Sequence, residues 1–128
     1  MRWDDETVGR ELLGFARSLL ERSTDDTQGL WPRAAVLLAR QSLEVALKTY
    51  WSAMAPGLEE CSTRAQLLCL GTYAGNDRLA GRANQVWAAL SRAAHFHPYE
   101  LPPTREELLL WFDTVQEVLE GTEPAWNR

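Results

Sequence analysis

The sequence predicts an all-α fold: an antiparallel four-helix bundle with one additional short helix, forming a single domain over residues 1–128. Apolar residues recur at the three- and four-residue spacing of helices along most of the chain. Glycine, proline and capping residues divide this pattern into five segments. No segment alternates apolar and polar residues as strands do. The chain has 128 residues, of which 45% are hydrophobic, and this suits one core.

The first two helices are expected over residues 4–22 and 32–54. The first opens on carboxylates, which favour the positive end of a helix dipole, and is followed by a turn-rich loop. The second starts at a proline and stops before Pro56-Gly57. It carries two apolar stripes, which are typical of the central helix of a bundle, and Glu44 is placed for an i,i+4 pair with Lys48.

A short third helix is expected over residues 63–73, capped by Ser62 and ended near Gly75. The fourth is expected over residues 77–96, because Pro98 disfavours helical geometry at the residue before it.

The fifth helix is expected to begin at Thr104, which is placed to form a capping box with Glu107. Its broad apolar face is expected to pack against the core. Gly121 is expected to end the helix as a C-terminal glycine.

Composition and charge exclude several classes of protein. Two cysteines exclude a disulfide-rich scaffold, and no apolar run is long enough to span a membrane. No secretory signal pattern opens the sequence, so we expect a cytoplasmic protein. The formal net charge of −5 argues against a general nucleic-acid coat, and no DNA partner is expected. Residues 61–99 nevertheless hold four arginines and one aspartate, which suits one phosphate-bearing substrate.

Most familiar chemical motifs are absent. The sequence has no GxxxxGK[ST], GxGxxG or HExxH pattern, so no phosphate loop or zinc helix is expected. Cys61 and Cys69 lack the paired spacing of a zinc site, and we expect two small buried thiols instead. No metal and no cofactor are expected.

One cluster, RAAHFHPYE over residues 92–100, combines an arginine with both histidines of the chain and a tyrosine. A histidine can act as general base or acid near neutral pH, and an arginine can bind a phosphate and stabilise its transition state. Arg92 and His95 are three residues apart and share a helix face, whereas Arg92 and His97 would lie about 140° apart on a continuous helix. His97 can therefore act beside Arg92 only if the chain turns or a partner subunit completes the site.

This cluster resembles the R-x4-H motif of the HEPN superfamily, with Arg92 and His97 in the two motif positions. Tyr99 extends it to R-x4-H-x-Y, the form typical of HEPN toxins that are paired with minimal nucleotidyltransferase antitoxins. The expected bundle, with the motif at the end of its penultimate long helix, is similar to that family. Two positions depart from its pattern: Ala93 follows the arginine, where active members often have a polar residue, and Pro98 precedes the tyrosine.

The resemblance implies a homodimer whose two motifs form a composite, metal-independent endoribonuclease site acting on RNA. It implies that Arg92 and His97 are the catalytic pair, and that Tyr99 is modified by the antitoxin to silence a toxin or defence effector. We further expect His95 and Arg82 to contact substrate.

The alternative is a catalytically inactive HEPN-like module that binds a nucleotide, RNA or protein, with Arg92 as a phosphate anchor. A purely structural interpretation also exists for each residue. His97 would cap the last carbonyls of its helix, Arg92 would pair with an acid, and His95 and Tyr99 would be surface neighbours.

Overall fold

The computed structural model describes residues 5–21, 31–95 and 101–123. Five α-helices fill most of these ranges, with one short 3-10 helix, η2, and no strand is found among the described residues. The all-α prediction is confirmed. The elements in chain order are α1 (Asp5–Glu21), α2 (Trp31–Met54), η2 (Leu58–Glu60), α3 (Thr63–Ala74), α4 (Asp77–Ala94) and α5 (Arg105–Gly121).

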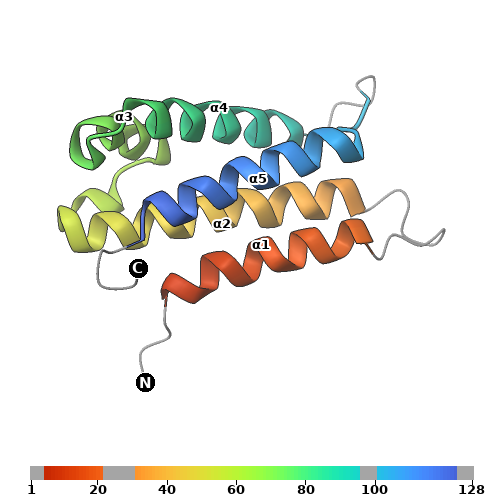
Figure 1. Cartoon of the computed structure of the whole chain (residues 1–128), viewed down its shortest axis with the longest axis horizontal. Helices are drawn as coiled ribbons and strands as arrows, with labels where there is room; N and C mark the ends of the chain where they lie inside the picture. The colour runs from red at the N-terminus through yellow and green to blue at the C-terminus, as the bar shows by residue number, and fades with distance from the viewer. Residues whose placement is uncertain (1–4, 22–30, 96–100, 124–128) are drawn as a thin grey trace.

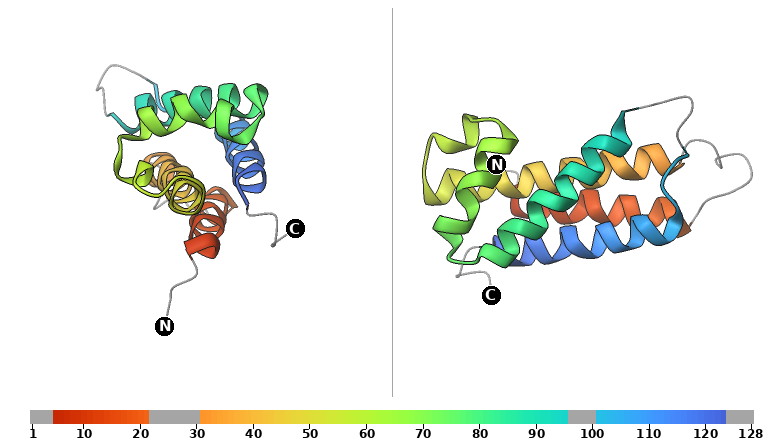
Figure 2. Two further views of the ribbon diagram at one scale, coloured as in Figure 1. Left: turned by 90° about the vertical axis from the view of Figure 1, so that its left-hand side faces the viewer. Right: turned by 90° about the horizontal axis from the view of Figure 1, so that it is seen from above.

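The four long helices run in alternating directions, as expected of an antiparallel bundle (Figure 1). The helices α1 and α2 form a closely packed hairpin, and α5 lies against both. The helix α4 crosses over α2 and α5 on the side of the bundle away from α1 (Figure 2). The short α3 lies at the end of the bundle where α2 ends and α4 begins. The other end therefore brings together the end of α4 and the beginning of α5.

One apolar core fills the space between the helices. Its two largest fully buried side chains are Trp51 of α2 and Phe112 of α5. Trp51 contacts Tyr73 of α3 edge to face, with ring centroids 5.0 Å apart, and so joins the short helix to the bundle. The contribution of α4 to the core comes from residues spaced by three or four, namely Leu79, Ala83, Val86 and Leu90.

Local capping chemistry sets the helix boundaries that the sequence predicted. Ser62 Oγ accepts a hydrogen bond from the main-chain N–H of Ala65 at the start of α3, and Gly75 ends that helix in the left-handed region at φ 65°. Thr104 and Glu107 form a reciprocal capping box at the start of α5, with both hydrogen bonds at 3.2 Å.

Two local predictions are wrong, and a third is right in position but not in mechanism. The helix α4 ends at Ala94, two residues earlier than expected, because His95 already has extended backbone with ψ 118°. Gly121 is the last residue of α5, and Thr122 caps the helix at a negative φ, so the glycine is not required for a left-handed turn. Glu44 accepts a hydrogen bond from Arg40 at 3.0 Å, on the N-terminal side, and does not pair with Lys48 in the described structure.

Gly121 lies close to a side chain of α4. A Cβ there would lie 2.6 Å from Cδ2 of Leu79, which is buried on α4. In the three described ranges, no helix combines the length and the apolar character that crossing a membrane requires.

Candidate functional site

Arg92 and His95 lie together at the end of α4. Arg92 is in the last turn of the helix and His95 is its C-cap, and both side chains are exposed. The main-chain N–H of His95 donates to the carbonyl oxygen of Arg92 at 3.3 Å, which closes the helix. The chain thus leaves helical geometry two residues before His97, so the separation expected on a continuous helix does not apply. His97 and Tyr99 lie outside the described residues.

The residues around Arg92 hold the last turn of α4 against the apolar core. Leu90 is fully buried, and Ala93 and Ala94 pack against the core on either side. Ser91 also faces inward, with its Oγ removed from solvent. The main chain at residue 92 is therefore held by its neighbours while its own side chain points outward. Its positive charge also suits the negative end of the α4 dipole.

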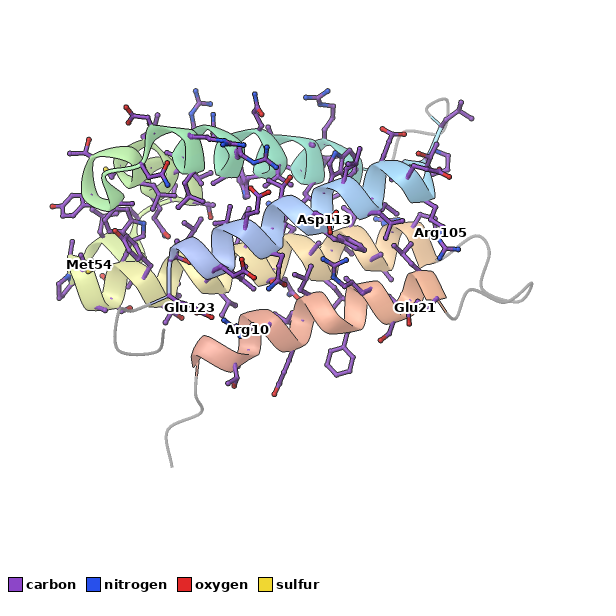
Figure 3. The ribbon with its side chains drawn as sticks, in the orientation of Figure 1. Arg10, Glu21, Met54, Arg105, Asp113 and Glu123 are labelled. Atoms are coloured by element: carbon purple, nitrogen blue, oxygen red, sulfur yellow. The ribbon has the colours of Figure 1, made fainter. Side chains whose placement is uncertain are left out.

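The arginines of the bundle differ in whether a carboxylate neutralises them. Four arginines are paired with carboxylates in the structure: Arg10 with Glu123, Arg17 with Asp113, Arg40 with Glu44, and Arg82 with Glu117. Two of these pairs join helices, and a third joins α1 to Glu123, just after the end of α5, where Figure 3 shows Arg10 and Glu123 on facing sides. Arg92 has no ion-pair partner in the described part of the chain.

Arg82, the second arginine expected to bind substrate, is engaged by α5. Its Nε lies 2.8 Å from Glu117 Oε2, and its Nη2 donates to Glu117 Oε1 at 3.2 Å and to Thr114 Oγ1 at 3.3 Å. An incoming phosphate would have to compete with a carboxylate already in place. The structure brings Arg92 and His95 together but directs Arg82 to the seam between α4 and α5.

The end of the bundle beside Arg92 also holds the start of α5. Arg105 is the first residue of that helix and is exposed, and Figure 3 shows it at the end of the bundle opposite Met54. This arginine has no ion-pair partner within the described ranges, so a second available cation lies at the same end of the molecule as the last turn of α4. Sequence reasoning did not single it out, because its place follows from the antiparallel course of α4 and α5.

Other chemical groups of the bundle lie away from this end. A shallow depression of about 330 Å³ between α1 and α2 is lined by Leu12, Gln41, Glu44, Val45 and Lys48, and none of the expected site residues borders it. Cys61 is exposed, contrary to expectation, because it lies in the turn between η2 and α3. In the described residues, no three His, Cys, Asp or Glu side chains gather as a metal site would require. Burial raises the pKa of the Tyr50 hydroxyl on α2, near the other end of the bundle.

Comparisons of the chain with models of protein families, with curated proteins and with solved structures find no significant match.

Proposed function

We propose that the chain is a metal-independent endoribonuclease of the HEPN type that acts as a homodimer, with Arg92 and His97 as its catalytic pair. The observation that carries the proposal is the state of Arg92. It is exposed and free of carboxylate partners among the described residues, as Arg78 and Arg105 are, and it lies in the last turn of α4, whose neighbouring residues pack against the core, at the arginine position of the R-x4-H motif. An arginine in this state is ready to bind a phosphate.

The chemistry needs only these side chains and the RNA itself. The 2′-oxygen of the RNA attacks the adjacent phosphorus, and the bond from phosphorus to the 5′-oxygen breaks. The products are a 2′,3′-cyclic phosphate and a free 5′-hydroxyl. A histidine takes the proton of the 2′-hydroxyl or supplies one to the leaving 5′-oxygen, and the arginine stabilises the charge on the phosphoryl oxygens. His97 has the first role and Arg92 the second.

The dimer follows from the motif resemblance and accounts for the sparse site. Each chain contributes one arginine and one histidine of the motif, and two copies facing each other supply both an acid and a base. His95, exposed at the helix end, is proposed to contact the RNA beside Arg92. The biological setting that we propose is a cytoplasmic toxin or defence effector, with a nucleotidyltransferase antitoxin as partner.

The test is cleavage of total cellular RNA and tRNA by the purified protein in EDTA. Arg92→Ala and His97→Ala are each expected to slow cleavage by at least about 100-fold, which is the usual contribution of a general acid–base group or a charge-stabilising donor. Arg64→Ala is the matched control. It removes the same charge from an exposed site on α3, at the other end of the bundle, and is expected to cleave normally.

Sedimentation and circular dichroism establish that each variant is folded and has the assembly state of the wild type. Equal activity of Arg92→Ala and Arg64→Ala would overturn the catalytic role of Arg92. A folded, dimeric wild-type protein that cuts no RNA would favour the inactive binding module, with Arg92 as its phosphate anchor.

A further inference from the structure

The outward face of α4 carries a second exposed arginine in line with Arg92. Arg78, Gln85 and Arg92 are spaced by seven residues, so they deviate by only about 20° per step around the helix. All three are exposed. The residues exposed between them on this face are small or polar, namely Gly81, Asn84 and Ala88.

This face carries two exposed arginines, and its one carboxylate is the exposed Asp77 at the start of the helix. Arg78, like Arg92, has no ion-pair partner in the part of the chain that the structure describes. Asp77 is also exposed, but its Oδ1 lies 3.0 Å from the position that a Cβ on Gly71 of α3 would take, and the rest of α4 up to Arg92 has no carboxylate. Arg82 points to α5 and is neutralised there.

The same face is open and lacks apolar anchors. The helix α4 is the outermost layer of the bundle, and no other described helix covers its outer side (Figure 2). The exposed large apolar side chains of the described residues lie on other elements: Phe15, Leu37, Met54, Leu68, Tyr73, Leu101, Leu109 and Leu110. Protein interfaces depend on buried aromatic and apolar anchors, so the chemistry of this face favours a polyanion over a protein partner.

The dimensions suit a strand of several nucleotides. Arg78 and Arg92 are fourteen residues apart, which corresponds to about 21 Å along the helix. Single-stranded sites on proteins typically span about 4–16 nucleotides, and a positively charged track along the phosphates is a usual part of them. No aromatic side chain is exposed on the described surface of α4 for a base to stack on, so contact through phosphates is expected to tolerate any sequence.

We infer that Arg78 is a distal phosphate contact for single-stranded RNA, which runs along the outer face of α4 with its reacting phosphodiester at Arg92. The inference rests on the proposed ribonuclease function and deepens it. The RNA leaves the end of the bundle and follows α4 toward α3. Arg78 holds the strand without taking part in the reaction.

The test is binding of a fluorescent, 2′-O-methylated RNA of about ten nucleotides, a length within the usual single-strand range, measured by anisotropy over a series of salt concentrations. The 2′-O-methyl group blocks cleavage, so binding is measured alone. Arg78→Ala is expected to raise the Kd about fivefold, and to reduce the slope of log Kd against log salt by about 0.7, the value for one contact with a single strand. Arg78→Lys is expected to bind nearly as well as the wild type. Arg64→Ala, with the same change of charge on α3, is expected to leave Kd and slope unchanged.

A dinucleotide is the second probe, because it reaches Arg92 but cannot reach Arg78. Its affinity is expected to be unchanged in Arg78→Ala. An unchanged Kd for the longer RNA in Arg78→Ala would overturn the inference, and so would an equal loss for the dinucleotide. Loss of the dimer in this variant, measured by sedimentation, would also overturn it, since the face would then be a protein interface.

These outcomes separate the inference from the proposed function. A wild-type protein that neither binds nor cleaves RNA would contradict both the proposed function and the distal contact at Arg78. A wild type that cleaves in EDTA and loses cleavage in Arg92→Ala, while Arg78→Ala binds the longer RNA normally, keeps the ribonuclease and removes only the distal contact.

Discussion

Ser42 of α2 donates its hydroxyl hydrogen to the main-chain carbonyl oxygen of Gly9 in α1, with 2.5 Å between the two oxygens. Both residues are buried. The helices approach so closely here that a Cβ on Gly9 would lie 3.3 Å from the carbonyl oxygen of Ser42. A small residue on each helix thus lets α1 and α2 approach closely, and one buried hydrogen bond joins them at this point.

Ser42→Ala removes this hydrogen bond and is expected to lower the free energy of unfolding by about 1 kcal/mol. Ser52→Ala is the matched control on the same helix. Its hydroxyl donates to the carbonyl of Lys48 within α2 and is exposed, so its loss is expected to change stability by no more than about 0.5 kcal/mol. Urea unfolding followed by circular dichroism compares the two, and equal losses would contradict a special role for the contact with Gly9.

Gly121→Ala and Gly14→Ala are expected to change stability in opposite directions. A methyl group on residue 121 meets the buried Leu79, and overpacking of this kind typically costs about 1–3 kcal/mol. A methyl group on Gly14, in the middle of α1, meets nothing within 4 Å. Alanine there gains up to about 1 kcal/mol from its higher helix propensity. Thermal unfolding of both variants checks the two signs, and a Gly121→Ala protein as stable as Gly14→Ala would refute the close packing.

The Glu117→Gln variant distinguishes two roles of Arg82: a structural ion pair with Glu117, or a contact with substrate. If the pair is only structural, Glu117→Gln lowers the free energy of unfolding by no more than about 1 kcal/mol, because both side chains are partly exposed. It then leaves the affinity for RNA unchanged. If Arg82 binds substrate, the same change frees its guanidinium and tightens RNA binding. We expect the first result. The measurements are urea unfolding and anisotropy with 2′-O-methylated RNA.

Tyr99→Phe distinguishes regulation from catalysis. The motif resemblance implies that the tyrosine hydroxyl accepts an adenylyl group from a nucleotidyltransferase, so the variant is expected to cleave RNA but to resist silencing. The measurement is transfer of label from α-labelled ATP in the presence of a minimal nucleotidyltransferase of the type that pairs with HEPN toxins. Tyr50→Phe and Tyr73→Phe are the controls, and labelling of Tyr99→Phe at the wild-type level would exclude this role.

The fold was largely predictable because its determinants are local. Ser62, Gly75 and the Thr104–Glu107 box act within one turn of their own positions, and the structure has each of them where the spacing predicted. Gly121 shows the limit of that reasoning. It was assigned to a helix stop, and the helix does end there, but its close contact with Leu79 across the seam, forty-two positions away in sequence, could not be predicted from local spacing.

The candidate site was only partly predictable for the same reason. Whether an arginine is available depends on partners from other helices, and periodicity does not reveal them: Arg82 and Glu117 are thirty-five residues apart, and Arg17 and Asp113 ninety-six. A usable signal was nevertheless present for Arg78. Its spacing from Arg92 is two heptads, with no acidic residue between them at that period.

The seam between α4 and α5 separates charge as well as joining two helices. The helix α4 holds three arginines and one carboxylate, and α5 holds one arginine and five carboxylates. Neighbouring helix axes lie about 8–10 Å apart, which is close to the Debye length of about 8 Å at physiological salt. A phosphate near the outer side of α4 therefore senses the local arginines more strongly than the net charge of −5. Among the described helices, positive charge thus gathers on α4 and negative charge on α5, and under the proposed function this separation would turn the α4 side toward an approaching RNA.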